Sequence, residues 1–122
     1  MIKKKIFISF DMSNDRALKN EIVAQSQMYG ANFKIAGWSM TPENINSKWM
    51  KEAKFRIGKC DALVVLTGDN THQAEGVKKE IEIAHAANVK IIQLLSHPQN
   101  SPVEAAGTPN DWSPETLQDL LN

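Results

Sequence analysis

The stretch Ala62-Leu63-Val64-Val65-Leu66, followed directly by Thr67-Gly68-Asp69-Asn70, decides the fold class of this chain. Five apolar residues without alternation are typical of a central parallel strand that is covered on both faces of its sheet. The polar residues that follow indicate the end of that strand and the start of a turn. The stretch therefore predicts a parallel sheet with helices on both sides.

The sequence around this strand alternates apolar runs with segments of helical period. Further strands are expected at residues 6–10, 33–38 and 89–95. Helices are expected at residues 15–29, 41–57 and 71–87, the last two with N-caps at Thr41 and Thr71. This order predicts an α/β fold of flavodoxin-like type, in which a small parallel sheet carries helices on both faces in three layers.

The last part of the chain departs from this alternation. Residues 96–113 contain several prolines and predict an irregular segment without a strand or helix. Ser113 and Pro114 then begin a short helix at residues 114–121. A chain of 122 residues builds one hydrophobic core, so we expect a single domain over residues 1–122 with its core at about 4–95.

Charge and cysteine content limit the classes of partner and compartment. Lys and Arg number 14, as do Asp and Glu, so no surplus of positive charge favours nucleic acid or an anionic membrane surface. No run approaches the roughly 20 apolar residues of a membrane helix. Cys60 is the single cysteine, which excludes an internal disulfide and fits a reducing compartment. We expect a cytoplasmic protein without a nucleic-acid or membrane partner.

The third predicted helix carries the strongest candidate for a functional residue. Val77, Ile81 and Ala84 form its apolar side, and Glu80 falls on that same side. A carboxylate there must reach solvent at an edge, pair with a buried donor, or lie in a cleft with a raised pKa. Ligands of open parallel sheets bind beyond the carboxyl ends of the strands, and perturbed carboxylates concentrate at active sites. Glu80 is therefore the first candidate for a catalytic residue.

Other residues at the expected ligand edge allow two readings each. The loop at 67–71 either binds a phosphate at a helix N-terminus or caps the helix, and it lacks the Walker pattern. Asp11 and Asp15 follow the first strand like the acidic pair of response-regulator receivers. The acceptor aspartate and late lysine of receivers are missing, and helix capping accounts for Asp15. Trp38 either stacks on a base or belongs to the core.

The histidines and the cysteine do not predict a metal site. His72, His85 and His97 lack metal-ligand spacing with Cys60, so we expect no metal. Cys60 is interpreted as a small buried hydrophobic residue.

Several stretches of the chain resemble the TIR-like domain family. Residues 5–10 (KIFISF) resemble the first box of TIR domains. Residues 61–68 (DALVVLTG), with Thr71 and residues 77–84 (VKKEIEIA), look like the TIR-like group that includes the Thoeris antiphage protein. The resemblance spans about residues 4–95, with the motifs in the family's order and spacing.

The resemblance implies a specific activity. In catalytic TIR domains a glutamate on the third helix is needed to cleave the bond between nicotinamide and ribose in NAD, and Glu80 aligns with it. NAD is then the substrate, no cofactor is needed, and an ADP-ribose or cyclic ADP-ribose product acts as a signal in antiphage defence. Substrate contacts are expected from Ser9, Phe10, Asp11, Trp38, Ser39, Thr67 and Thr71.

The third helix departs from the family pattern in two places. The family has an aromatic residue before the glutamate, where this chain has Gly76 and Val77. It has a serine where this chain has Gln73 or Ala74. The floor of the pocket is therefore expected to differ.

The resemblance also implies partners and leaves two alternative functions open. TIR active sites are often completed across subunits, so we expect self-association through TIR-type surfaces and, as a partner, a nucleotide-sensing effector protein. The first alternative is a non-catalytic TIR-like or flavodoxin-like interaction module. The second is a nucleoside deoxyribosyltransferase-like enzyme, which shares the architecture and also uses a glutamate.

Overall fold

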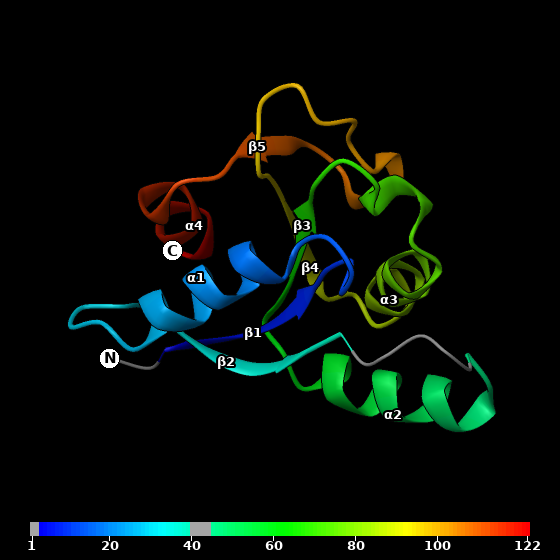
Figure 1. The fold of residues 1–122 in the computed structure, drawn as a ribbon. Helices are drawn as coiled ribbons and strands as arrows, with labels where there is room; N and C mark the ends of the chain where they lie inside the picture. The colour runs from blue at the N-terminus through cyan, green and yellow to red at the C-terminus, as the bar shows by residue number, and fades with distance from the viewer. Residues whose placement is uncertain (1–2, 40–44) are drawn as a thin grey trace.

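A parallel sheet forms the centre of the protein (Figure 1). The computed structural model describes residues 3–39 and 45–122. Within these residues the strands are β1 (Lys4–Ser9), β2 (Phe33–Trp38), β3 (Ala62–Thr67), β4 (Lys90–Leu95) and β5 (Pro109–Asp111). Their order is β2-β1-β3-β4-β5, so the strand order reverses between β1 and β3 as in doubly wound sheets. The predicted flavodoxin-like α/β fold is confirmed.

Helices cover both faces of this sheet. In the described part of the chain they are α1 (Arg16–Ser26), α2 (Ser47–Gly58), α3 (Glu75–Ala86) and α4 (Pro114–Leu121). Helices α1 and α4 pack on one face, and α2 and α3 pack on the other (Figure 1). The molecule therefore has the three layers that the sequence predicts.

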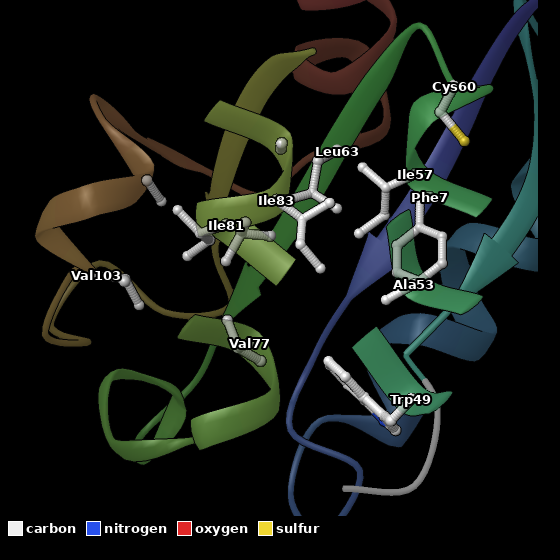
Figure 2. Close-up of a cluster of buried hydrophobic side chains, with 13 residues drawn as sticks. Phe7, Trp49, Ala53, Ile57, Cys60, Leu63, Val77, Ile81, Ile83 and Val103 are labelled. Atoms are coloured by element: carbon white, nitrogen blue, oxygen red, sulfur yellow. The ribbon is translucent and has the colours of Figure 1, made fainter. Parts of the chain in front are cut away.

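Alternate residues of the central strands supply two hydrophobic clusters, one on each face. Phe7 and Leu63 pack toward α2 and α3, beside residues such as Trp49 (Figure 2). Ile8 and Val64 belong to the cluster on the α1 and α4 side. All six residues of β3 are buried, which explains why its sequence lacks alternation.

The pairing of β2 with β1 shifts by one residue near its middle. The pairs are Ile6 with Ile35, Phe7 with Gly37, and Ile8 with Trp38. Ala36 is therefore an extra residue in β2, and the residues after it change the face toward which they point. As a result Trp38 points toward α1, and Ser39 points toward α3.

Two helix boundaries differ from the prediction. Helix α1 ends at Ser26, short of residue 29, because Tyr29 is fully exposed and has no packing partner that would extend the helix. Gly30 follows in a left-handed conformation with φ of 87°, which favours glycine. Helix α3 was expected to begin at Thr71, but a short 3-10 turn (Thr71–Gln73) comes first and α3 begins at Glu75.

The start of α2 also lies later than predicted. The helix begins at Ser47, and the side chain of Asn46 accepts a hydrogen bond from the backbone N–H of Trp49 at 2.9 Å. Asn46 is thus the N-cap. The start predicted at residues 41–43, with its cap at Thr41, lies outside the described residues.

The prediction that residues 96–113 hold no strand or helix is wrong. A 3-10 turn (Glu104–Ala106) and the short strand β5 lie there, and β5 pairs in parallel with β4. Pro109 is tolerated because it is the first residue of an edge strand. The buried side chain of Gln93 fixes this segment, since it accepts from the N–H of Val103 and donates to the carbonyl groups of Val103 and Gly107.

The predicted C-terminal helix is confirmed as α4. The Ser113 hydroxyl accepts a hydrogen bond from the backbone N–H of Thr116 at 3.0 Å, and Pro114 occupies the first turn. Leu117 and Leu121 are buried against the sheet. Over the residues described, no helix has both the length and the apolar character needed to cross a membrane.

Candidate functional site

Glu80 lies on the inward side of α3 and is completely buried. Its Oε1 atom accepts two hydrogen bonds, from the Ser9 hydroxyl at 2.8 Å and from the Ser39 hydroxyl at 2.6 Å. Ser9 is the last residue of β1, and Ser39 directly follows β2. Two neighbouring strands therefore end at the same carboxylate.

The electrostatic state of Glu80 is unusual for a glutamate. Burial away from water raises its pKa to about 7, against the opposing effect of the hydrogen bonds from Ser39 and Ser9. The second carboxylate oxygen, Oε2, is buried and has no hydrogen-bond partner among the described residues. An unsatisfied buried oxygen costs free energy, so Glu80 carries an unused acceptor at the ligand edge of the sheet.

A cleft of about 290 Å³ opens beside Glu80 at the carboxyl ends of β1 and β2. Ser39 and Val77 line this cleft, and Val77 lies one helical turn before Glu80 on α3. The backbone N–H of Phe10, another lining residue, donates to the Ser39 hydroxyl at 3.0 Å. Ser39 therefore connects the cleft to the buried carboxylate.

The polar groups of this cleft have a clear charge bias. Asp11 and Glu75 contribute carboxylates, and Asn70 and Gln73 contribute amides. No lysine or arginine is among the described residues that line it. The cleft favours a neutral or cationic ligand group over a phosphate.

The residues predicted as substrate contacts separate into two groups. Ser9 and Ser39 bind Glu80, and Phe10 and Asp11 line the adjacent cleft. The other three lie elsewhere. Thr67 donates to the Gln93 side chain at 2.8 Å, Thr71 donates to Asp15, and Trp38 is 42% exposed on the α1 side. The structure brings four of the seven together with Glu80.

Asp15 is a buried acid, and the prediction that it caps the first helix is wrong. It stands at the N-cap position of α1, but its side chain makes no capping hydrogen bond. Instead its Oδ2 accepts from the Thr71 hydroxyl at 2.8 Å, and Thr71 in turn accepts from the N–H of Gly68 at 2.8 Å. Burial raises the pKa of Asp15, and the nearby Asp11 and Asp69 carboxylates add to the rise.

Asp15 also borders a second cleft of about 400 Å³ on the α1 side of the sheet. Its other wall includes Asp69, His97 and Trp112. The periodicity of the sequence does not indicate this cleft, because its residues come from α1 and from four separate loops. Among the residues described, no group of three or more His, Cys, Asp and Glu side chains is arranged to hold a metal ion.

The strand order defines an α/β domain of flavodoxin-like type. A cleft lies at the carboxyl ends of its strands, and a buried carboxylate lies at this ligand-binding edge. The sequence model of the family "Thoeris protein ThsB, TIR-like domain" matches residues 7–101. The chain belongs to this family, which confirms the resemblance drawn from the sequence.

A solved structure has the same fold over nearly the whole chain. The structure of the Clostridium botulinum CMP N-glycosidase BcmB has a TM-score of 0.56 and 19% sequence identity. The alignment covers 96% of this chain and 98% of that chain. At this identity the likeness concerns the fold alone. No curated protein matches the sequence.

Proposed function

We propose that this protein cleaves the bond between nicotinamide and ribose in NAD as part of antiphage defence. One observation carries the proposal: Glu80 is a buried carboxylate with a raised pKa and one unpartnered oxygen at the ligand edge of the sheet. Membership of the Thoeris TIR-like family supports the defence role. The likeness to a CMP N-glycosidase supports cleavage of a bond between a base and ribose.

The reaction breaks the bond between C1′ of the ribose and the nicotinamide nitrogen. The electron pair of that bond leaves with nicotinamide, and positive charge develops on the ribose ring. A fixed carboxylate stabilises such charge most strongly where water is excluded. Glu80 Oε2 supplies this group. Water then attacks C1′ and gives ADP-ribose with release of a proton, or a nitrogen of the adenine ring attacks and gives a cyclic product.

Ser9 and Ser39 hold the carboxylate in one orientation. Both donate to Oε1, which leaves Oε2 as the oxygen that meets the substrate. Their hydrogen bonds favour the ionised form of Glu80 and so oppose the effect of burial on its pKa. The serines therefore orient the acid and keep a useful fraction of it charged near neutral pH.

The substrate enters through the cleft lined by Phe10 and Asp11. Nicotinamide is cationic in NAD, and the carboxylates of Asp11 and Glu75 suit a cationic ring. Glu80 has no exposed surface, so the Val77 side chain, which lines the cleft one helical turn before Glu80, must move aside for the ribose to reach Oε2. Self-association or an activating signal supplies the free energy for this opening, in line with the expected assembly of TIR domains.

Release of nicotinamide from NAD by the purified, concentrated protein tests the proposal. We expect Glu80→Gln to reduce release by at least a hundredfold without lowering the melting temperature. Glu82→Gln is the matched control, because Glu82 lies on the exposed side of the same helix in a surface ion pair with Lys79. Full activity in Glu80→Gln contradicts the assignment of Glu80.

The same assay separates the alternative functions. Cleavage of CMP in place of NAD makes the protein a nucleotide N-glycosidase of different base preference, as the structural likeness also allows. Transfer between deoxynucleosides supports the deoxyribosyltransferase alternative. If no substrate is cleaved with or without a natural trigger, the interaction module is the remaining function. A nucleotide-sensing effector that responds to the product provides the cellular readout.

A further inference from the structure

Lys19 presents a cation on the α1 side of the sheet, next to Phe10, a residue that also lines the cleft. Its Nζ atom lies 4.5 Å from the centroid of the Trp38 ring and 5.9 Å from that of Phe10. Phe10 lines the cleft, and Trp38 directly precedes Ser39, the residue that holds Glu80. The Lys19 ammonium therefore lies on the α1 side of the strand ends, beside Phe10 of the cleft lining and beside Trp38, the chain neighbour of Ser39.

This ammonium has no anionic partner in the described part of the chain. The ion pairs there join Arg56 to Glu52, Lys78 to Glu75 and Lys79 to Glu82. Among the described residues the Lys19 ammonium makes no hydrogen bond either, and it lies over the rings of Phe10 and Trp38. An ammonium has three N–H donors, so all three are available to an anion. A phosphate would bind them more strongly than the rings do.

The charge distribution around the cleft favours one orientation of a dinucleotide. The cleft itself is lined by Asp11 and Glu75 and carries no described lysine or arginine, so it repels a phosphate group. In NAD the diphosphate is attached to the 5′ carbon of the ribose whose C1′ bond is to break. A substrate with its ribose at Glu80 must therefore place its diphosphate outside the acidic cleft, where a separate cation has to meet it.

We propose that Lys19 is the diphosphate anchor of this site, and that Phe10 and Trp38 hold its ammonium in position for the 5′ side of the substrate ribose. This inference rests on the proposed function. Lys19 contributes to binding and orientation, and it takes no part in breaking the bond to nicotinamide. It also selects nucleotides over nucleosides, because a nucleoside offers no phosphate to it.

Kinetics of Lys19→Gln with two substrates test the proposal. With NAD we expect KM to rise about tenfold with little change in kcat, and the dependence of KM on salt to weaken. With nicotinamide riboside, which has no phosphate, KM should stay within a factor of two. Equal effects on both substrates, or no effect on NAD, overturn the proposal.

Lys59→Gln is the matched control. Lys59 lies 3.9 Å from the Phe55 ring centroid, so it makes the same kind of contact, but it sits at the end of α2, away from the cleft. Lys59→Gln should leave the KM values for NAD and for nicotinamide riboside unchanged. Lys19→Arg should restore most of the NAD affinity, which a packing role alone does not explain.

Calorimetric titration with ADP-ribose separates this inference from the proposed reaction. If the protein has no turnover but binds ADP-ribose, and Lys19→Gln weakens that binding about tenfold, the anchor stands and the proposed reaction fails. If the wild-type protein binds neither NAD nor ADP-ribose, the anchor is wrong. If Glu80→Gln abolishes turnover while Lys19→Gln binds ADP-ribose normally, the reaction stands and the anchor fails.

Discussion

The Ser39 hydroxyl donates a 2.6 Å hydrogen bond to the carboxylate of Glu80, and the same hydroxyl accepts the N–H of Phe10 at 3.0 Å. One side chain therefore joins the end of β2, the loop after β1 and the inward side of α3. Ser39 also lines the cleft, so any change in its position alters both the shape of the cleft and the protonation of Glu80. This dual role leads to the first prediction.

Replacing Ser39 with Ala should move the pH dependence of activity upward. The Ser39 hydrogen bond lowers the pKa of Glu80, so its loss raises that pKa further above about 7. The rate is expected to rise with pH and to reach half its maximum at a higher pH than in the wild-type protein. A pH–rate profile of nicotinamide release between pH 5.5 and about 9 measures this shift. A profile that moves to lower pH contradicts the geometry.

The stability of the folded protein should fall as pH rises from about 4.5 to about 7. The folded state holds the Glu80 proton more tightly than the unfolded chain, whose pKa is near 4.5. Protonation thus contributes stability that is fully present below pH 4.5 and is lost as pH rises through about 7. The expected loss from this group is roughly 3 kcal/mol, taking 1.36 kcal/mol for each unit of pKa.

Urea unfolding of Glu80→Gln at a series of pH values isolates this contribution. The variant should have a flatter pH dependence and should exceed the wild-type stability at pH 8, because it buries no charge. Glu82→Gln should keep the wild-type slope, since Glu82 is exposed. A wild-type slope in Glu80→Gln would mean that another group titrates.

Replacing Thr71 with Val should destabilise the protein by about 1–3 kcal/mol, because it leaves the buried Asp15 carboxylate and the N–H of Gly68 without their shared partner. Chemical denaturation at pH 7 measures the change. Thr71→Ser keeps the hydroxyl and serves as the control. Unchanged stability in Thr71→Val would contradict the role of the hydroxyl group.

Gly68→Ala should be destabilising, because a Cβ atom there would collide with the carboxylate of Asp15. The Asp15 side chain would have to move, which breaks its hydrogen bond with Thr71. Gly58→Ala is the matched control, since nothing lies within 4 Å of a Cβ at the end of α2. It should be neutral or slightly stabilising. Melting temperatures of the two variants give the comparison.

Local periodicity was sufficient for the fold and for Glu80. The apolar run at 62–66 forms the fully buried β3, and the helical spacing from Val77 to Ala84 placed Glu80 on the buried side of α3. Both features depend on neighbours within a few residues, which is the range over which a sequence pattern is informative.

The other features depend on contacts between distant residues. The hydrogen bond between Asp15 and Thr71 joins residues 56 positions apart, and the pairing of Gln93 with Val103 converts an apparently irregular segment into an ordered edge of the sheet. Polar pairs of this kind leave no periodic pattern. The short strand β5 begins with a proline, a residue that in a sequence pattern indicates a loop and not a strand.

The extra residue Ala36 determines which of two neighbouring side chains meets the acid. With the register found at the start of β2, Ser9 would be aligned with Trp38, and an indole would point at Glu80. The insertion places Ser39 there and sends Trp38 to the side of Lys19. Pairing Ala36 with Phe7 in a regular ladder, in place of the bulge, would exchange these two side chains without altering either of them. The chemistry of this site can thus change through the register of one strand, with every functional residue kept.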